Sequence, residues 1–284
     1  MDRARQAVGF FDSGLGGRCV WRAFYRLLPH EHTVYAADRA YCSYGNRTDG
    51  EIVQRAQALT ALLLARRCKM IVVACNTATA AALPLLREAH PEIDVVGVVE
   101  PGAEAACRAT KSGHIAVIAT SGTIRGRAYE EAILRRMPEA RISALPCPLF
   151  VPMAEDGLTS GPLAEGMAAR YLDPIFRDPR EQGLEVPDTL VLACTHFPLL
   201  RGAISRVAGE GVTLVDSASN TAREVRRLLM EKHLARGAGT SAGMPLCPGS
   251  VRFLTTDDVP RFTRLGELFL NMSIAPCTVE QVEL

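Results

Sequence analysis

The feature that most constrains the fold is a short apolar run that ends in a cysteine and leads directly into a helix-forming segment. Residues 70–73 are apolar and β-branched at three positions, which predicts a short buried strand. Cys75, Asn76 and Thr77 follow, and an Ala/Leu-rich stretch after them predicts a helix. In α/β proteins, this kind of turn lies at the carboxyl end of a strand, where ligands bind and helix N–H groups favour an anion.

A second stretch repeats this pattern. Residues 189–193 are mostly apolar and predict another buried strand, which is followed by Cys194, Thr195 and His196. Both stretches therefore read as an apolar strand, then Ala-Cys, then polar side chains. We take these two thiols, each at the end of a strand, as the centre of the molecule.

Strands and helices alternate twice along the chain, which predicts two parallel-sheet α/β domains. A glycine- and serine-containing turn precedes each cysteine turn, at residues 12–17 and 120–123. This weak internal repeat favours a duplicated, pseudo-symmetric pair of domains with the active site in the cleft between them. The remaining predicted strands are 7–11, 33–37, 94–99, 114–119, 142–145, 212–215 and 251–255.

Helix signals and loop signals complete the prediction. Thr48 and Glu51 form a possible capping box for a helix that runs to about residue 67. Further helices are predicted at 18–28, 163–176 and 221–234. Pro-rich residues 146–152, charged residues 177–185 and Gly/Ala/Ser/Pro-rich residues 236–250 predict loops.

Composition excludes several classes of function. The 284 residues include 32 basic and 31 acidic side chains, a formal net charge of +1, so no surface for nucleic acid or an anionic membrane is predicted. No apolar segment approaches the length of a membrane span. Nine cysteines without a CxxC pair do not predict a disulfide framework.

A lone cysteine at a strand end is more often a packing residue than a catalytic one. Cys75 and Cys194 differ because both lie in matched turns and precede polar residues, and a thiolate at a helix start can be reactive. We interpret the cysteines without this context as structural or incidental: Cys19, Cys68, Cys107, Cys147, Cys247 and Cys277.

Other motif interpretations fit less well. The turn Asp12 to Gly17 lacks the third glycine of a dinucleotide fingerprint, since Cys19 stands there, and Asp12 would repel a pyrophosphate. Cys194 and His196 have the spacing of half a metal site, but no two further ligands present themselves, so no metal is predicted. A histidine beside a thiol serves better as an acid/base partner.

These residues resemble the signatures of the glutamate racemase family, in the right order from about Val8 to Asp257. The resemblance is carried by residues 11–17, by Tyr44 and Gly45, by residues 74–78 and by residues 194–200. It implies a discontinuous first domain, 1–99 with 212–284, around a second domain, 100–211. It also implies cofactor-independent interconversion of L- and D-glutamate for peptidoglycan synthesis, in a cytoplasmic homodimer.

The chemistry implied by the resemblance agrees with the residues. Inverting an α-carbon without a cofactor requires a base on one face and an acid on the other, and two thiols supply both. A pyridoxal enzyme would need a Schiff-base lysine, and Lys69, Lys111 and Lys232 stand in no such motif. This favours a reaction without a cofactor.

The resemblance also implies a role for each motif residue. Cys75 and Cys194 are the two acid/base thiols, with Asp12 assisting the first and His196 the second. The substrate-binding set is small and polar, which suits a charged amino acid without a buried arginine: Ser13, Tyr44, Gly45, Asn76, Thr77, Thr123 and Thr195. Asp38 and Glu155 match supporting acidic positions. Ser43 departs from the family, which usually has proline before Tyr-Gly.

Several alternatives remain open at the level of sequence. An aspartate racemase would use the same two thiols on a shorter substrate. A single-thiol isomerase or decarboxylase of a small dicarboxylate would need only one of them. A Cys-His thiol hydrolase would need only Cys194 and His196, and a binding protein would bind glutamate without exchanging its α-proton.

Overall fold

The computed structural model describes residues 3–237, 248–270 and 278–284. The chain forms two compact units, which we call unit 1 (Met1–Val98 with Ala218–Leu284) and unit 2 (Val99–Ser217). Each unit contains one parallel sheet, so the predicted class of two parallel-sheet α/β domains is confirmed. The sequence predicts that the chain returns to the first domain between residues 211 and 212. In the structure the strand at 213–215 still pairs within the sheet of unit 2, which extends to Ser217.

Sheet A of unit 1 has the strand order β10-β9-β2-β1-β3-β4, and its described pairings are all parallel. Its strands, in that order, are Val279–Gln281, Val251–Thr255, Thr33–Ala37, Val8–Asp12, Met70–Val73 and Asp94–Gly97. Phe11 of β1 lies opposite Val73 of β3. The carboxyl ends of these two central strands therefore lie at the same edge of the sheet.

Helices cover both faces of sheet A because its strands are apolar on both sides. One face packs on α1 (Arg18–Leu27), α11 (Ala218–Glu231) and α12 (Val259–Leu270), and the other on α2 (Asp49–Ala65) and α3 (Asn76–Ala89). Alternate residues of one strand serve opposite faces, as Phe10 and Phe11 do. The predicted capping box at the start of α2 is confirmed, with Thr48 and Glu51 bonded in both directions.

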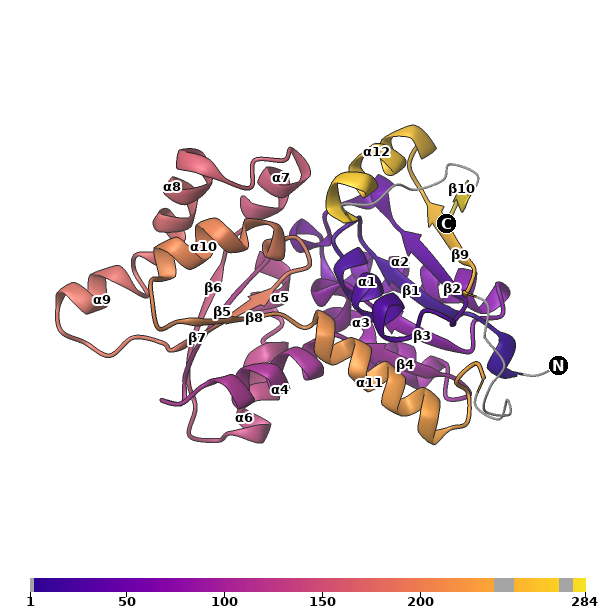
Figure 1. Cartoon of the computed structure of the whole chain (residues 1–284), viewed down its shortest axis with the longest axis horizontal. Helices are drawn as coiled ribbons and strands as arrows, with labels where there is room; N and C mark the ends of the chain where they lie inside the picture. The colour runs from indigo at the N-terminus through magenta and orange to yellow at the C-terminus, as the bar shows by residue number, and fades with distance from the viewer. Residues whose placement is uncertain (1–2, 238–247, 271–277) are drawn as a thin grey trace. The chain divides into compact units, whose positions relative to one another are not determined.

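Unit 2 repeats this plan around sheet B, whose strand order is β6-β5-β7-β8. These strands are Arg141–Pro146, His114–Ala119, Thr189–Ala193 and Thr213–Val215. Figure 1 shows α4 (Val99–Ala109) and α6 (Ala128–Arg136) on one side of sheet B, and α8 (Gly161–Leu172) and α10 (Arg201–Ala208) on the other. Shorter helical segments occur at Ser121–Arg125 (α5), Phe150–Glu155 (α7), Arg177–Glu181 (α9) and Phe197–Leu200 (η4).

The two units share one topology. The order β2-β1-β3-β4 in sheet A matches β6-β5-β7-β8 in sheet B. The helix pairs match as well: α1 packs with α11 as α6 packs with α4, and α2 packs with α3 as α8 packs with α10. This correspondence explains the internal repeat in the sequence, because each half contains the same four strands in the same order.

Two predicted loops are wrong in part. Residues 150–155 form α7. The helix tolerates Pro152 because this residue lies in the first turn, where its missing N–H removes no helical hydrogen bond. Residues 177–181 form α9, in which Arg177 pairs with Glu181 one turn later. Most of the predicted loop at 236–250 lies outside the described residues. In the described parts of the chain, no helix combines the length and the apolar character that a bilayer crossing requires.

Candidate active site

The first group of predicted site residues lies at the carboxyl edge of sheet A. Strand β1 ends at Asp12, and neighbouring strand β3 ends two residues before Cys75. Cys75 is the N-cap of α3, and its sulfur accepts a hydrogen bond from the N–H of Ala78 at 3.5 Å. The Cys75 thiol also lies 3.7 Å from the Ser13 hydroxyl. The structure thus places Asp12, Ser13 and Cys75 together within unit 1.

The Asp12 carboxylate holds the turn that follows it. One of its oxygens, Oδ2, accepts the N–H groups of Gly14 at 3.2 Å and Gly17 at 2.9 Å. Gly17 is required by close packing, since a Cβ there would lie 2.7 Å from the Cβ of Asp12 and 2.9 Å from that of Ala74. The glycine-rich turn is therefore built around a buried carboxylate, which does not suit a phosphate.

The surroundings of Cys75 keep it protonated in the substrate-free protein. Only 5% of the residue is exposed. Burial, followed by the negative charge of Asp12, raises the pKa of the thiol to about 12, and hydrogen bonds from Ala78 and Ser13 only partly offset this. A positive charge that arrives next to the sulfur would lower that pKa again, and the ammonium group of an amino acid carries such a charge.

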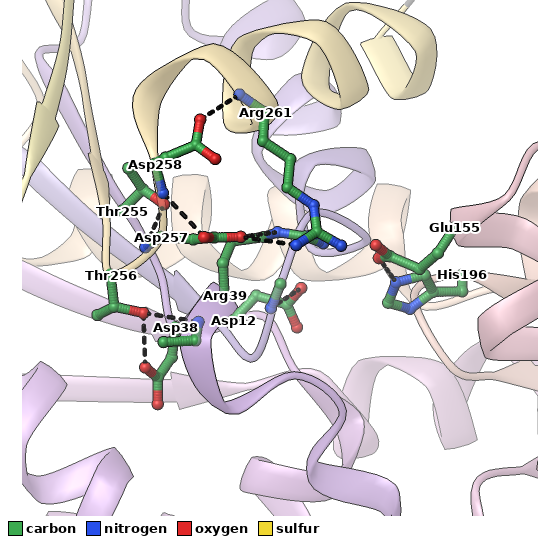
Figure 2. Close-up of polar contacts among 12 residues, drawn as sticks. Asp12, Asp38, Arg39, Glu155, His196, Thr255, Thr256, Asp257, Asp258 and Arg261 are labelled. Atoms are coloured by element: carbon green, nitrogen blue, oxygen red, sulfur yellow. Dashed lines mark hydrogen bonds and ion pairs between the residues drawn. The ribbon is translucent and has the colours of Figure 1, made fainter.

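Asp38 organises the loop that contains Tyr44. Its carboxylate accepts hydrogen bonds from the Tyr44 hydroxyl at 2.6 Å, from Arg55 at 2.7 and 2.8 Å, and from Thr256 at 3.0 Å. Figure 2 shows the contact with Thr256. Burial and then Asp38 hold the pKa of Tyr44 far above its ordinary value. The Tyr44 hydroxyl is thus a donor to Asp38, and Asp38 acts as a structural anchor.

Sequence reasoning missed the arginines of unit 1. The predicted small-polar set needs no buried arginine, yet Arg18 and Arg39 are both buried. Nε of Arg39 lies 3.9 Å from Asp257, and Arg261 reaches the same carboxylate at 3.6 Å (Figure 2). For Arg18 a signal did exist, because it precedes Trp21 by three positions and so falls on the apolar face of α1.

The second group of predicted residues lies in unit 2, at the carboxyl edge of sheet B. Cys194 follows β7 directly and is 6% exposed. Its sulfur lies 3.9 Å from Nδ1 of His196, and Nε2 of His196 lies 2.8 Å from Glu155 at the end of α7. Figure 2 shows the imidazole and this carboxylate facing each other. A thiol, an imidazole and a carboxylate thus form a chain in which a proton can move.

The remaining predicted residues lie near these two groups in the fold. Asn76 and Thr77 begin α3 directly after Cys75, and Ser43 accepts a hydrogen bond from the N–H of Gly45 at 3.3 Å. Thr123 lies in α5, capped by Thr120, after a strand that neighbours β7. Thr195 separates Cys194 from His196 and is 7% exposed.

The chemistry available in these groups is proton transfer. Each unit presents a buried thiol beside a group that can accept or hold a proton, Asp12 in unit 1 and His196 in unit 2. In the part of the chain that the structure describes, no three His, Cys, Asp or Glu side chains are grouped as metal ligands.

Comparison with known proteins identifies the family of the chain. Residues 18–225 match the model of the Asp/Glu/Hydantoin racemase family. The chain is 42% identical over 266 residues to a glutamate racemase from Geobacter metallireducens, covering 94% of this chain and 93% of that protein.

Solved structures show the same similarity. A glutamate racemase isoform from Bacillus anthracis superimposes with a TM-score of 0.88 at 34% identity, covering 99% of this chain and 98% of the other. A glutamate racemase from Francisella tularensis, solved in complex with D-glutamate, gives a TM-score of 0.85 at 29% identity, covering 99% and 98%. With its fold, its two thiol turns and these relatives in agreement, the chain belongs to the Asp/Glu/Hydantoin racemase family.

Proposed function

We propose that this protein is a cofactor-independent glutamate racemase that interconverts L- and D-glutamate with two thiols. The observation that carries the proposal is the matched pair of buried cysteines, each at a strand end beside a proton-handling partner. The specific substrate is supported by the relatives, which are named glutamate racemases at about 40% identity over nearly the whole chain.

In the proposed reaction, one thiolate removes the α-proton from one face of the substrate. The other thiol then donates its own proton to the opposite face, and the carbanion becomes the inverted α-carbon. The first cysteine ends as a thiol and the second as a thiolate, so the two exchange roles in the reverse direction. Asp12 assists at Cys75, and His196, held by Glu155, assists at Cys194.

Substrate binding is assigned to small polar groups and to backbone N–H groups. The proposed contacts of the ammonium and the two carboxylates are Ser13, Tyr44, Gly45, Asn76, Thr77, Thr123 and Thr195. The Tyr44 hydroxyl already donates its hydrogen bond to Asp38. We therefore assign the substrate contact at this position to the backbone of Tyr44 and Gly45 and not to the hydroxyl. The substrate-binding cleft that the sequence predicts between the two halves stays a prediction.

The family resemblance carries further proposals about biological context. We expect the product, D-glutamate, to supply peptidoglycan synthesis, and we expect the protein to act in the cytoplasm as a homodimer. Analytical ultracentrifugation at micromolar concentration tests the dimer directly: a monomer at all concentrations would remove that proposal.

The activity is tested by NMR in D₂O with purified protein and no added cofactor. We expect deuterium to enter the α-position of glutamate while D-glutamate appears. Exchange with aspartate alone would keep the two-thiol mechanism and change the substrate. Binding of glutamate without exchange would indicate a binding protein.

Single substitutions test the two thiols. Cys75→Ser and Cys194→Ser are each expected to lower racemisation by about 10²–10⁴-fold, because an alcohol is a far weaker acid/base group here. Cys107→Ser is the control: Cys107 is a half-buried residue of α4, and this variant should keep wild-type activity. A thiol hydrolase would tolerate Cys75→Ser, so full activity in that variant would contradict the two-thiol mechanism.

A further inference from the structure

Arg18 is a fully buried cation that has no hydrogen-bond partner among the side chains that the structure describes. It is the first residue of α1, directly after the turn that Asp12 holds, and it is 0% exposed. Among residues 3–237, 248–264, 266 and 278–284, none of its three guanidinium nitrogens finds an acceptor. Buried arginines are normally paired, because a charge removed from water requires compensation. This side chain therefore needs an explanation.

An aromatic cage surrounds the Arg18 guanidinium. Its Cζ lies 4.0 Å from the ring centre of Phe262, 5.1 Å from that of Phe253 and 5.9 Å from that of Tyr35. Gly266 of α12 contacts its Nη1 so closely that no Cβ would fit there. The ring faces attract the cation but accept no conventional hydrogen bond, so the cage holds the positive charge without neutralising it.

The cage is connected to Asp12 through Tyr35. The Tyr35 hydroxyl donates to the carbonyl of Gly14 at 3.3 Å, and the Gly14 N–H donates to Oδ2 of Asp12 at 3.2 Å. The other oxygen of Asp12, Oδ1, is buried and has no partner among the described residues. Two buried, opposite and incompletely satisfied charges thus lie at the two ends of one turn, where a low dielectric extends their attraction.

Cys75 interacts with the acidic member of this pair of charges, Asp12. Burial, and then Asp12, raises the pKa of its thiol. Among the described residues, the titratable groups that interact with this thiol are Asp12, Tyr35 and Tyr44, none of which supplies a positive charge. The charged or titratable groups that act on Arg18 are Tyr35, Arg39 and Asp12. Asp12 is thus the acidic group that acts on both side chains, on the Cys75 thiol and on the Arg18 guanidinium.

We propose that Arg18 is a positioning residue that acts through Asp12: its buried charge balances the Asp12 carboxylate, so that the Cys75 thiol can lose its proton beside it. The inference rests on the proposed function, which makes Cys75 an acid/base group. It predicts that removing the charge of Arg18 makes Cys75 harder to ionise, although the two side chains do not touch.

The test uses the alkylation of Cys75 by iodoacetamide, which reports the thiolate fraction without any assay of racemisation. Arg18→Met replaces the guanidinium with an apolar side chain that suits an aromatic cage. We expect Cys75 in this variant to react about tenfold more slowly between pH 7.5 and 9.5, the effect of one pKa unit. Peptide mass spectrometry separates Cys75 from the other cysteines.

Two matched variants separate charge from packing. Arg18→Lys keeps the positive charge and should retain most of the wild-type alkylation rate. Arg26→Met removes the same charge from an exposed position of α1 and should change nothing. Should Arg18→Met not fold, Arg18→Gln removes the charge in its place, with folding checked by circular dichroism.

The outcomes distinguish this inference from the proposed function. Wild-type alkylation of Cys75 in the folded, uncharged Arg18 variant would overturn the role of Arg18, whether or not the protein racemises glutamate. Slower alkylation together with a lower kcat, and a pH–rate profile displaced to higher pH, would support it. Slower alkylation in a protein that never exchanges the α-proton of glutamate would instead remove the racemase function and leave the Arg18 effect on the thiol intact.

Discussion

His196 and Glu155 are 41 positions apart in the chain and 2.8 Å apart in the fold. The carboxylate fixes one imidazole nitrogen and leaves the other directed toward the sulfur of Cys194, at 3.9 Å. A histidine held in this way has a defined ring orientation, with one nitrogen at the carboxylate and the other at the thiol. At the scale of the residue, Glu155 therefore supports Cys194 through a second side chain.

Replacing Glu155 with Gln tests this support. Glu155→Gln removes the carboxylate that holds the His196 ring in place, so we expect kcat for glutamate to fall by roughly 10²-fold while KM changes little. Glu165→Gln is the matched control, since Glu165 forms an ion pair with Arg206 in which both side chains are exposed. An unchanged kcat in Glu155→Gln would show that the carboxylate has no part in proton transfer.

The motif residues could be predicted from sequence, whereas their buried ionic partners could not. Asp12, Cys75 and Cys194 stand in local patterns of strand, turn and helix, which a sequence displays directly. Arg39 and Arg55 carry no such local pattern, and their burial depends on segments far away in the chain, whereas the spacing of Arg18 from Trp21 does place it on the apolar face of α1. The segment that contains Thr256 is an example: Thr256 donates a hydrogen bond to Asp38, 218 positions away in the chain.

At the scale of the element, each sheet has a charged residue at its amino edge that forms hydrogen bonds to the neighbouring loops. In unit 1, Lys69 is buried before β3 and donates to Glu31 at 2.6 Å and to the carbonyls of Ala4 and Leu234. In unit 2, Asp188 precedes β7 and accepts the N–H groups of Lys111 and Ser112, each at 2.7 Å. These ties hold loops at the edge opposite the two thiols.

The tie at Asp188 predicts a pH-dependent stability. Burial alone would raise the pKa of Asp188, but hydrogen bonds from Thr110, Ser112, Lys111 and Thr189 outweigh it and hold the pKa well below its usual range. The stabilisation is therefore complete above the ordinary carboxyl pKa of about 4 and is lost as pH falls further. We expect the protection of the β5 and β7 amides against exchange, measured relative to the intrinsic exchange rate at each pH, to fall below this pH.

The matched variants for this prediction are Asp188→Asn and Asp178→Asn. Asp188→Asn is expected to be less stable than the wild type at pH 7 and to lose this difference as the solution is acidified, because the wild-type carboxylate is then protonated. Asp178 is exposed on α9, so its substitution should not alter the pH dependence. A constant gap between Asp188→Asn and the wild type from pH 7 to pH 3 would contradict the assignment.

Elements with a strong local signal were predicted most accurately. The strands at 33–37, 114–119 and 251–255 match the structure residue for residue, because runs dominated by apolar residues define buried parallel strands. Helix α7 was missed because Pro152 within it and the prolines before it resemble a loop, and β10 was missed because three residues with two exposed side chains give no periodic signal. Tertiary pairing determines such segments.

At the scale of the whole molecule, the two halves of the chain exchange a helix. The helix after β4 is α4, which packs in unit 2, and the helix after β8 is α11, which packs in unit 1 (Figure 1). In unit 1, α11 contributes Ala222, Val225 and Leu229 to the core beside α1. Unit 2 is continuous in sequence, whereas unit 1 requires two separate segments.

This arrangement predicts which fragments fold. Residues 99–217 contain all of sheet B with helices on both faces, and should unfold cooperatively on their own. Residues 1–98 lack α11, and leaving Val225 and Leu229 out of the core removes roughly 1.5–3 kcal/mol for each, a large part of a total of about 5–15 kcal/mol. Urea titrations followed by circular dichroism compare these fragments, and cooperative unfolding of 1–98 alone would contradict the argument.

The exchange of helices also separates two kinds of repeat. The repeat in sequence runs from β1 to α4 and then from β5 to α11, while the folded units group α11 with β1–β4 and α4 with β5–β8. The two are out of phase by one helix. A gene that encoded only one sequence repeat would thus produce a sheet without the helix that covers it, and with a helix that packs on the sheet of the other repeat. A duplication of this form therefore requires both repeats in one chain.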